Sequence, residues 1–145
     1  PAFRISTRKI GEEEIGDLEI TGVEGLFSVC LNTDPYTYLG TRKISLAPNA
    51  NLDTPLAIAT FKNLTLKKLL PVVLGSLGIG KTTTTSSRIV DLRGDVTEAQ
   101  AVAYKSVPLQ VDGDFLGNFK KFSFQYKAAC LDVVMPIKPS DFKNY

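Results

Sequence analysis

Hydrophobic and polar residues alternate with a period of two along much of this chain, and that period predicts β-strands with one face against a core. The segments that alternate, or that are apolar on both faces, cover residues 3–7, 18–20, 25–31, 44–46, 56–61, 122–127 and 131–134. Residues 25–31 suit a central strand, and residues 122–127 predict an aromatic face against the core and a polar face toward water. About nine strands separated by turn signals predict a mostly β fold, either a β-sandwich or two packed antiparallel sheets.

One segment has helical periodicity instead. Its apolar residues between Leu66 and Val73 fall at positions i, i+3, i+4 and i+7, and Thr65 is a suitable N-cap. Pro71 interrupts the pattern, so we expect one short helix in the β fold. Residues 97–100 offer a second helical candidate, which is too short to carry weight by itself.

The composition fits one globular domain of 145 residues, of which 43% are hydrophobic and 22% charged. No apolar run approaches the roughly 18 residues of a membrane-spanning helix, and no secretory signal opens the chain, so we expect a cytoplasmic location. The net charge of +2 and the scattered lysine pairs lack the basic stripe of a nucleic-acid surface, so we expect no nucleic-acid partner. The chain begins with Pro1 rather than Met, and we expect it to be a piece of a longer protein.

The absence of histidine excludes several kinds of catalysis. Ser-His-Asp and Cys-His nucleophile systems need an imidazole base, and His-based zinc sites need an imidazole ligand. Cys30 and Cys130 stand 100 positions apart in apolar, strand-like contexts, which favours buried, unreactive thiols over a disulfide between them. Carboxylates therefore remain as the groups for acid–base chemistry.

Residues 75–82 match the phosphate-binding pattern GxxxxGK(S/T), in which Lys81 would contact the terminal phosphates and Thr82 a magnesium ion. That pattern works between a strand and a helix, with backbone N–H groups around the phosphates. Here the helical segment comes before the match and a β-branched, Ser-rich stretch follows it, so a Gly-rich turn after a helix explains the match more simply. A phosphate-loop NTPase is therefore the least favoured of three functional hypotheses.

Two loops place carboxylates where they could meet a ligand. Asp112-Gly113 is a tight-turn signal between extended segments, and it would hold Asp114 at the tip of a loop. Asp53 lies in a loop rich in Asn and Pro, whose backbone carbonyls are free to bind a hard cation such as Mg²⁺. The simpler alternative is that both residues are solvated aspartates in turns.

Ordered motifs around these loops resemble the C-terminal domain of the diacylglycerol-kinase-like lipid kinases. That domain has a strand ending in Asn, a Gly-containing turn, a Leu-x-Pro-x-Ala segment, an Asp-Gly-x-Leu type loop, a helix and a Val-x-Val-Asp-Gly-Glu type motif. The corresponding residues here are Asn32, 38–40, 46–50, 52–56, the segment after Thr65, and 109–114. The resemblance covers roughly residues 15 to 135, and the order and spacing of the motifs carry it.

The resemblance implies one half of a two-domain enzyme that transfers the γ-phosphoryl group of ATP, with Mg²⁺, to a lipid hydroxyl such as that of diacylglycerol. The Gly-Gly-Asp-Gly nucleotide loop belongs to the N-terminal domain of that family and is not in this chain, so the chain alone is expected to be inactive. The implied partners are that nucleotide-binding domain and the lipid, with peripheral contact at the inner face of the membrane.

The resemblance also assigns site residues. Asp114 stands where the family has the Glu proposed as general base, and Asn32 and Asp112 fall at substrate-binding positions. Thr54 aligns with the family's metal-ligand Asp, and Asp53 stands one place earlier as the alternative ligand. The side chain of Asp114 is one methylene shorter than that of Glu, so its loop would have to lie closer to the substrate.

A second hypothesis, of a different class, is a free-standing β-sandwich module that binds a partner and has no catalysis. Its contact residues would be the aromatic side chains Tyr36, Tyr38, Phe142 and Tyr145. In that case the Asp-Gly turn would be only a turn.

Overall fold

The computed structural model describes residues 1–14, 21–65, 89–130 and 132, which form eight strands. The strands are β1 (Phe3–Lys9), β2 (Val23–Gly25), β3 (Phe27–Leu31), β4 (Thr37–Leu39), β5 (Arg42–Ile44), β6 (Leu56–Phe61), β7 (Val90–Val111) and β8 (Asp114–Gln125). Every strand pair is antiparallel, and no helix occurs in these ranges. The predicted mostly β fold of packed antiparallel sheets is therefore confirmed.

Several predicted elements lie outside the described residues. They are the helix after Thr65, the phosphate-loop match at 75–82 and the strand at 18–20. Of the strand predicted at 131–134, only residue 132 is described, and it is not in a strand. Across the described ranges, no helix is long and apolar enough to cross a membrane.

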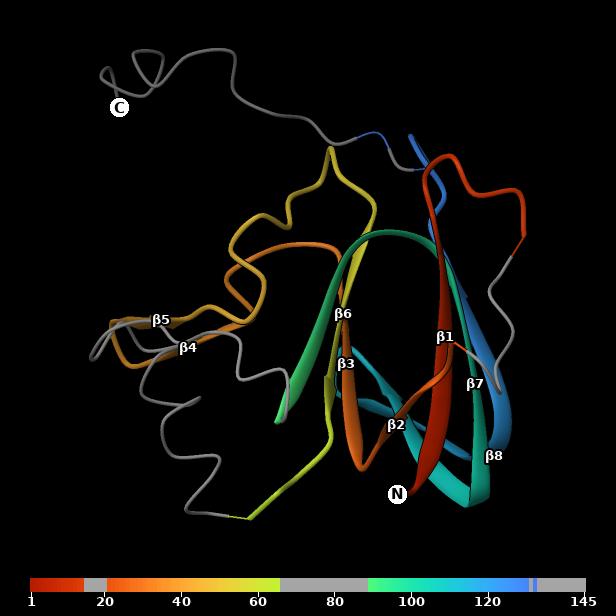
Figure 1. Cartoon of the computed structure of the whole chain (residues 1–145). Helices are drawn as coiled ribbons and strands as arrows, with labels where there is room; N and C mark the ends of the chain where they lie inside the picture. The colour runs from red at the N-terminus through yellow and green to blue at the C-terminus, as the bar shows by residue number, and fades with distance from the viewer. Residues whose placement is uncertain (15–20, 66–88, 131, 133–145) are drawn as a thin grey trace, which may run out of the picture.

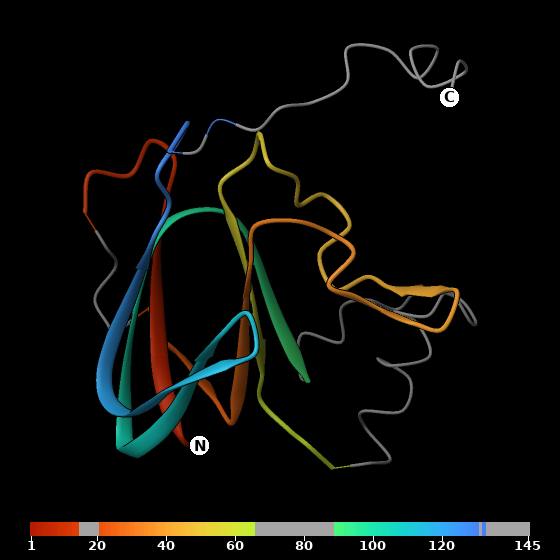
Figure 2. The same ribbon diagram turned by 180° about the vertical axis from the view of Figure 1, so that it is seen from behind.

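The 22-residue strand β7 runs through the whole fold and joins its two layers. Its first part, 90–96, pairs with β6, whose other edge pairs with β3. Its second part pairs with β1 on one edge, through 96–103, and with β8 on the other, through 98–111. The bend between the two parts falls near Asp95, which has a φ of 56°, so β3, β6 and the start of β7 face β2, β1, the rest of β7 and β8 (Figures 1 and 2).

The two layers also meet where β2 passes into β3. Leu26 alone separates these strands, and its N–H donates to the carbonyl of Phe61 in β6 at 2.8 Å. A Cβ on Gly25 would lie 2.5 Å from Cγ2 of Thr60, so only glycine fits at this close approach. The prediction of one central strand over 25–31 is wrong, because the segment splits at Leu26 and its two halves pair at opposite ends of the sheet.

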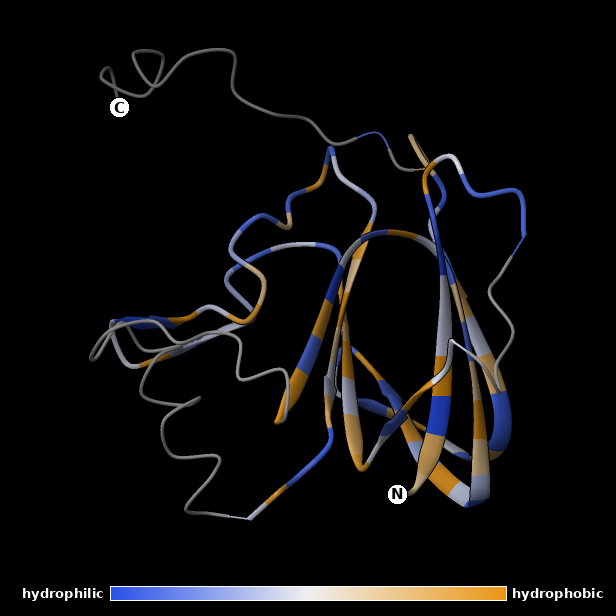
Figure 3. Ribbon diagram, viewed as in Figure 1, coloured by the Kyte–Doolittle hydropathy of each residue, from blue (hydrophilic) through white to orange (hydrophobic). Residues whose placement is uncertain are grey.

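The core lies between the layers and combines a few large side chains with small ones. Its buried members are Phe3, Ile5, Ile58, Val96, Ala99, Ala101 and Ala103. The alternating alanines of β7 let the layers approach closely, while burial of each larger side chain contributes roughly 2 kcal/mol. Figure 3 shows the underlying alternation as orange and blue bands along the strands.

The last part of β8 alternates as predicted. Phe122 and Phe124 pack against the core with ring centroids 5.8 Å apart, and Ser123 and Gln125 are exposed. Residues 97–100, the second helical candidate, lie instead in β7, so that prediction is wrong. They pair with β1 on one edge and β8 on the other, and this pairing outweighs a weak helical preference.

Candidate functional site

The end of the β7–β8 hairpin carries the aspartates that the sequence singles out. Val111 and Asp114 are the last paired residues, and Asp112 and Gly113 form the turn between them. The φ angles of the turn residues are 51° and 95°, the left-handed values that a two-residue type I′ turn requires. The predicted Asp-Gly turn is confirmed, but Asp114 is not at the loop tip: it is the first residue of β8 and pairs with Val111.

Asp114 has an exposed side chain at this end of the hairpin. Within the described residues its carboxylate has no hydrogen bond and no ion pair, and the same holds for Asp112. The neighbouring apolar side chains are also exposed: Val111 at 45%, Phe115 at 59% and Leu116 at 53%. A free carboxylate beside apolar groups can accept a proton or a hydrogen bond from a ligand that is itself partly apolar.

Asp34, in the loop after β3, is held very differently. One of its carboxylate oxygens accepts from Ser45 Oγ at 2.7 Å, and the other accepts from the N–H groups of Leu46 and Ala47, each at 3.1 Å. Its own N–H donates to the carbonyl of Ala50 at 3.1 Å. The residue ties the loop after β3 to the loop before β6. Sequence reasoning overlooked this role, although an Asp before a Pro at a strand end is a turn signal.

The loop before β6 holds the two predicted metal ligands, Asp53 and Thr54. The Thr54 hydroxyl accepts from the N–H of Asn51 at 3.0 Å and donates to the Asn51 carbonyl at 2.9 Å. The Asn51 amide oxygen accepts in turn from the N–H of Asp53 at 2.9 Å. These bonds close the loop on itself, so the exposed Asp53 carboxylate is the oxygen group that the loop leaves for a cation.

For the magnesium ion that the resemblance implies, this loop offers one free carboxylate, that of Asp53. No group of three or more His, Cys, Asp or Glu side chains that could hold a metal occurs in the described part of the chain. One carboxylate fits Mg²⁺ only when water and substrate phosphates complete its six ligands. Asp53 is a candidate for such a shared site, whereas loop closure already accounts for Thr54; both assignments stay predictions.

The predicted site residues lie in two separate regions. Asn32 follows Leu31, which pairs near the start of β6, so Asn32 lies at the same end of the β3–β6 pair as the Asp53 loop. Asp112 and Asp114 lie at the end of the β7–β8 hairpin. Among the residues that the structure describes, no hydrogen bond or ion pair joins the two regions. The structure thus offers two candidate contact regions rather than one assembled site.

The two cysteines differ in exposure. Cys30, in β3, is mostly buried, and burial raises its pKa to about 11, as expected of an unreactive thiol. Cys130 is exposed, so the expectation that it is buried is wrong. It follows a turn, in which Ala129 has a φ of 48°, instead of lying in a strand. Neither cysteine forms a disulfide.

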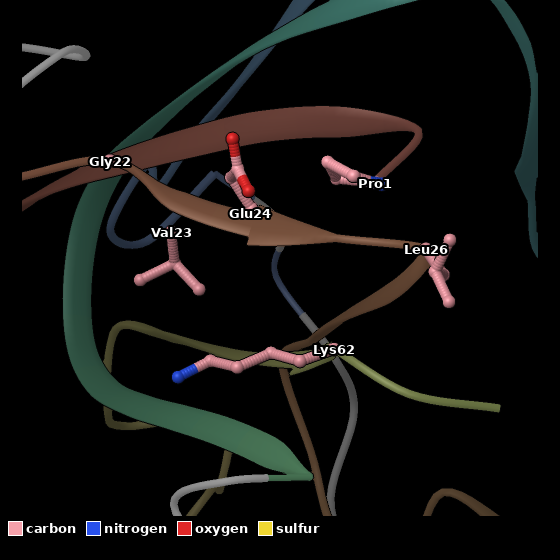
Figure 4. A pocket seen from close by; sticks show the side chains of 6 residues that line it. All are labelled: Pro1, Gly22, Val23, Glu24, Leu26 and Lys62. Carbon is pink, nitrogen blue, oxygen red and sulfur yellow. The ribbon is translucent and has the colours of Figure 1, made fainter. Parts of the chain in front are cut away.

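A polar cluster that sequence reasoning missed lies on the outer face of β1, β2 and β7. Arg4 and Tyr104 both donate to Oε1 of Glu24, at 2.9 and 2.7 Å. These hydrogen bonds, that of Tyr104 first, lower the pKa of Glu24, and the bond to Glu24 raises the pKa of both partners. A hollow of about 440 Å³ opens beside the cluster, with Glu24 and Lys62 on its wall (Figure 4). Because the Glu24 carboxylate already accepts two hydrogen bonds, it is not a free base for a ligand in this hollow.

A scan against protein-family models and searches of curated proteins and of solved structures found no match to this chain. The functional argument therefore rests on the residues and their arrangement. Of the predicted site residues, Asp53, Asp112 and Asp114 have carboxylates that remain free for a ligand within the described ranges.

Proposed function

We propose that this chain is the C-terminal half of an ATP-dependent lipid kinase, in which the β7–β8 hairpin meets the lipid hydroxyl. One observation carries the proposal: the Asp114 carboxylate is exposed, has no partner in the described residues, and lies among exposed apolar side chains. A lipid alcohol such as diacylglycerol requires both features, because its hydroxyl must meet a base while its acyl chains lie beside apolar groups. The order of motifs that resembles lipid kinases supports the same function.

In the proposed reaction Asp114 is the general base. Its carboxylate accepts the proton of the lipid hydroxyl as that oxygen forms a bond to the γ-phosphorus of ATP. The bond between the γ-phosphorus and the β–γ bridging oxygen breaks, and ADP leaves. Asn32 and Asp112 are proposed to orient the substrate by hydrogen bonds. Magnesium, when bound, neutralises charge on the phosphates.

The remaining parts of the proposed enzyme lie outside this chain. The nucleotide is assigned to an N-terminal domain of the whole protein, and the lipid to the inner face of the membrane, reached by peripheral contact. Asp53 is the residue of this chain that could share a magnesium ion with the nucleotide phosphates.

The test is Asp114→Asn in the whole protein that contains this chain. Asn keeps the shape of the side chain and removes its ability to take a proton, so phosphorylation of diacylglycerol in vesicles should fall by roughly 10²–10⁴-fold. Asp95→Asn is the control, because Asp95, in β7, is also an exposed aspartate whose carboxylate has no hydrogen bond or ion pair in the described residues. Transfer of labelled phosphate from ATP is measured together with the unfolding midpoint. Near-wild-type transfer by a folded Asp114→Asn protein would refute the assignment.

The β4–β5 hairpin favours a second function of another class, a binding module without catalysis. Tyr36, Tyr38 and Leu39 are 50%, 64% and 63% exposed at this separate two-stranded sheet. Exposed aromatic side chains are enriched in protein interfaces. Asp114→Asn distinguishes the two functions, because a binding module would retain its partner in that variant. The other expected contacts, Phe142 and Tyr145, lie outside the described residues.

A further inference from the structure

We propose that the outer part of the β7–β8 hairpin, residues 104–121, docks onto the surface of an anionic lipid bilayer. This docking hairpin has apolar side chains at its end and lysines at its base. The proposal deepens the proposed function and rests on it for the choice of a lipid surface. The docking hairpin would bring Asp114 to the depth at which the lipid hydroxyl lies in the bilayer.

The docking hairpin extends beyond the two layers of the fold. β1 pairs with β7 as far as Ala103, and the N–H of Tyr104 donates one last backbone hydrogen bond to the carbonyl of Ala2 at 3.0 Å. Beyond Tyr104, β7 and β8 pair only with each other in the described residues. A register shift between Val102 and Val107 breaks the ladder and turns the hairpin, whose end is cyan in Figure 2. Nearly all side chains from 104 to 121 are exposed as a result.

Four large apolar side chains of the docking hairpin are in contact with solvent. Val111, Phe115, Leu116 and Phe119 are between 38% and 59% exposed. Apolar side chains gathered on one protruding element mark an interaction surface. Asp112 and Asp114 lie among them, and because ionised carboxylates are costly in hydrocarbon, the end of the hairpin is restricted to the headgroup layer.

Three lysines at the base of the docking hairpin give it positive charge: Lys105, Lys120 and Lys121. All three are exposed, and within the described residues none of them forms an ion pair. Anionic headgroups attract ammonium groups near the membrane surface, and the underlying acyl chains accept apolar side chains. This complementarity in charge and polarity is why we assign a bilayer, rather than another protein, to the hairpin.

The dimensions of the hairpin agree with that assignment. The strand from Phe115 to Lys120 spans roughly 16 Å at a rise of about 3.3 Å per residue. The headgroup region on each side of a bilayer is roughly 5–8 Å thick. A tilted hairpin with Phe115 at the base of that region therefore keeps its lysines within reach of lipid phosphates through their long side chains. The hydroxyl of diacylglycerol lies in the same region, beside Asp114.

The test is co-sedimentation of the whole protein, without ATP, with phosphatidylcholine vesicles that contain or lack phosphatidylglycerol. We expect Phe115→Ser combined with Leu116→Ser to weaken binding to the anionic vesicles by at least roughly tenfold. We expect Lys120→Gln combined with Lys121→Gln to weaken it by roughly twentyfold, and only when phosphatidylglycerol is present. All these side chains are exposed, so the unfolding midpoint should stay unchanged.

The β4–β5 hairpin supplies matched controls. Leu39→Ser removes an equally exposed apolar side chain, and Arg42→Gln combined with Lys43→Gln removes two exposed positive charges. These controls should bind vesicles as the wild type does. An equal loss of binding in hairpin and control variants would overturn the assignment, since the effect would then be one of overall charge and polarity.

Two further outcomes would overturn the docking proposal. One is vesicle binding that neither hairpin variant changes. The other is a loss of vesicle binding that comes with a lowered unfolding midpoint, because the hairpin would then pack against another part of the protein. Since no ATP is present, these results are independent of the Asp114→Asn assay, and docking and catalysis can fail separately.

Discussion

Asp34 and Asp114 both stand beside the end of a strand, next to a residue that favours a turn, and the fold gives them opposite surroundings. The carboxylate of Asp34 accepts three hydrogen bonds, one from Ser45 and two from backbone N–H groups. The carboxylate of Asp114 accepts none from the described residues and is exposed. One aspartate joins two loops, and the other is open to a ligand.

The difference arises from the path of the chain rather than from the turns themselves. The segment after β5 folds back so that the N–H groups of Leu46 and Ala47 point at Asp34. The Asp112-Gly113 turn reverses the chain in two residues, and the described chain places no donor opposite Asp114. An aspartate in a turn is therefore a functional candidate only where the fold leaves its oxygens without donors.

Asp34→Ala should give the largest change in stability. It removes a charged acceptor from two backbone N–H groups and one hydroxyl, and hydrogen bonds to charged groups contribute about 1.5–3 kcal/mol each without being additive. We expect the free energy of unfolding in urea to fall by about 3 kcal/mol. Asp114→Ala is the control and should change it by no more than about 0.5 kcal/mol. If both variants had the same free energy of unfolding, the contrast between a bonded Asp34 and a free Asp114 would be refuted.

Gly113→Ala should give a smaller loss with a different signature. Gly113 has a φ of 95°, and a Cβ there costs about 1 kcal/mol of backbone strain, although no atom lies within 4 Å of its position. Because the turn sets the position of Asp114, lipid phosphorylation should fall more than the change in stability explains. Gly94→Ala is the control, since Gly94 also has open space and has no positive φ. Loss of stability with full activity would show that the turn does not position the base.

Local patterns predicted those parts of the fold that depend on neighbouring residues alone. The alternation at 3–7 and 122–127 and the apolar run at 56–61 mark real strands, although the last strand ends at Gln125, and Asp112-Gly113 forms the expected turn. The split of residues 25–31 was not predictable, because it follows from the close approach of Gly25 to Thr60 across the sheet. The bent strand β7 was likewise hidden, since its three partners are distant in sequence.

The candidate site divides in the same way. Exposure of Asp114 follows from its turn, and the sequence was sufficient to predict it. The role of Asp34 depends on donors 11 to 13 positions away, and the Glu24–Tyr104 hydrogen bond joins residues 80 positions apart. No local pattern reports such pairings, so sequence reasoning overlooked both.

The smallest effects concern Asp53 and Thr54, which extend the contrast between free and bonded side chains to the proposed magnesium loop. Thr54→Val removes two hydrogen bonds to Asn51 in an exposed loop and should lower the free energy of unfolding by about 0.5 kcal/mol. The magnesium concentration for half-maximal lipid phosphorylation should stay the same. Asp53→Asn should do the reverse, leaving stability unchanged and raising that concentration, because its free carboxylate is the ligand the loop offers. Titration of the whole protein with Mg²⁺, beside urea unfolding, measures both. If Thr54→Val raises the magnesium requirement as much as Asp53→Asn does, the Thr54 hydroxyl is also a ligand. A side chain that already has hydrogen bonds within this loop could then still bind the metal.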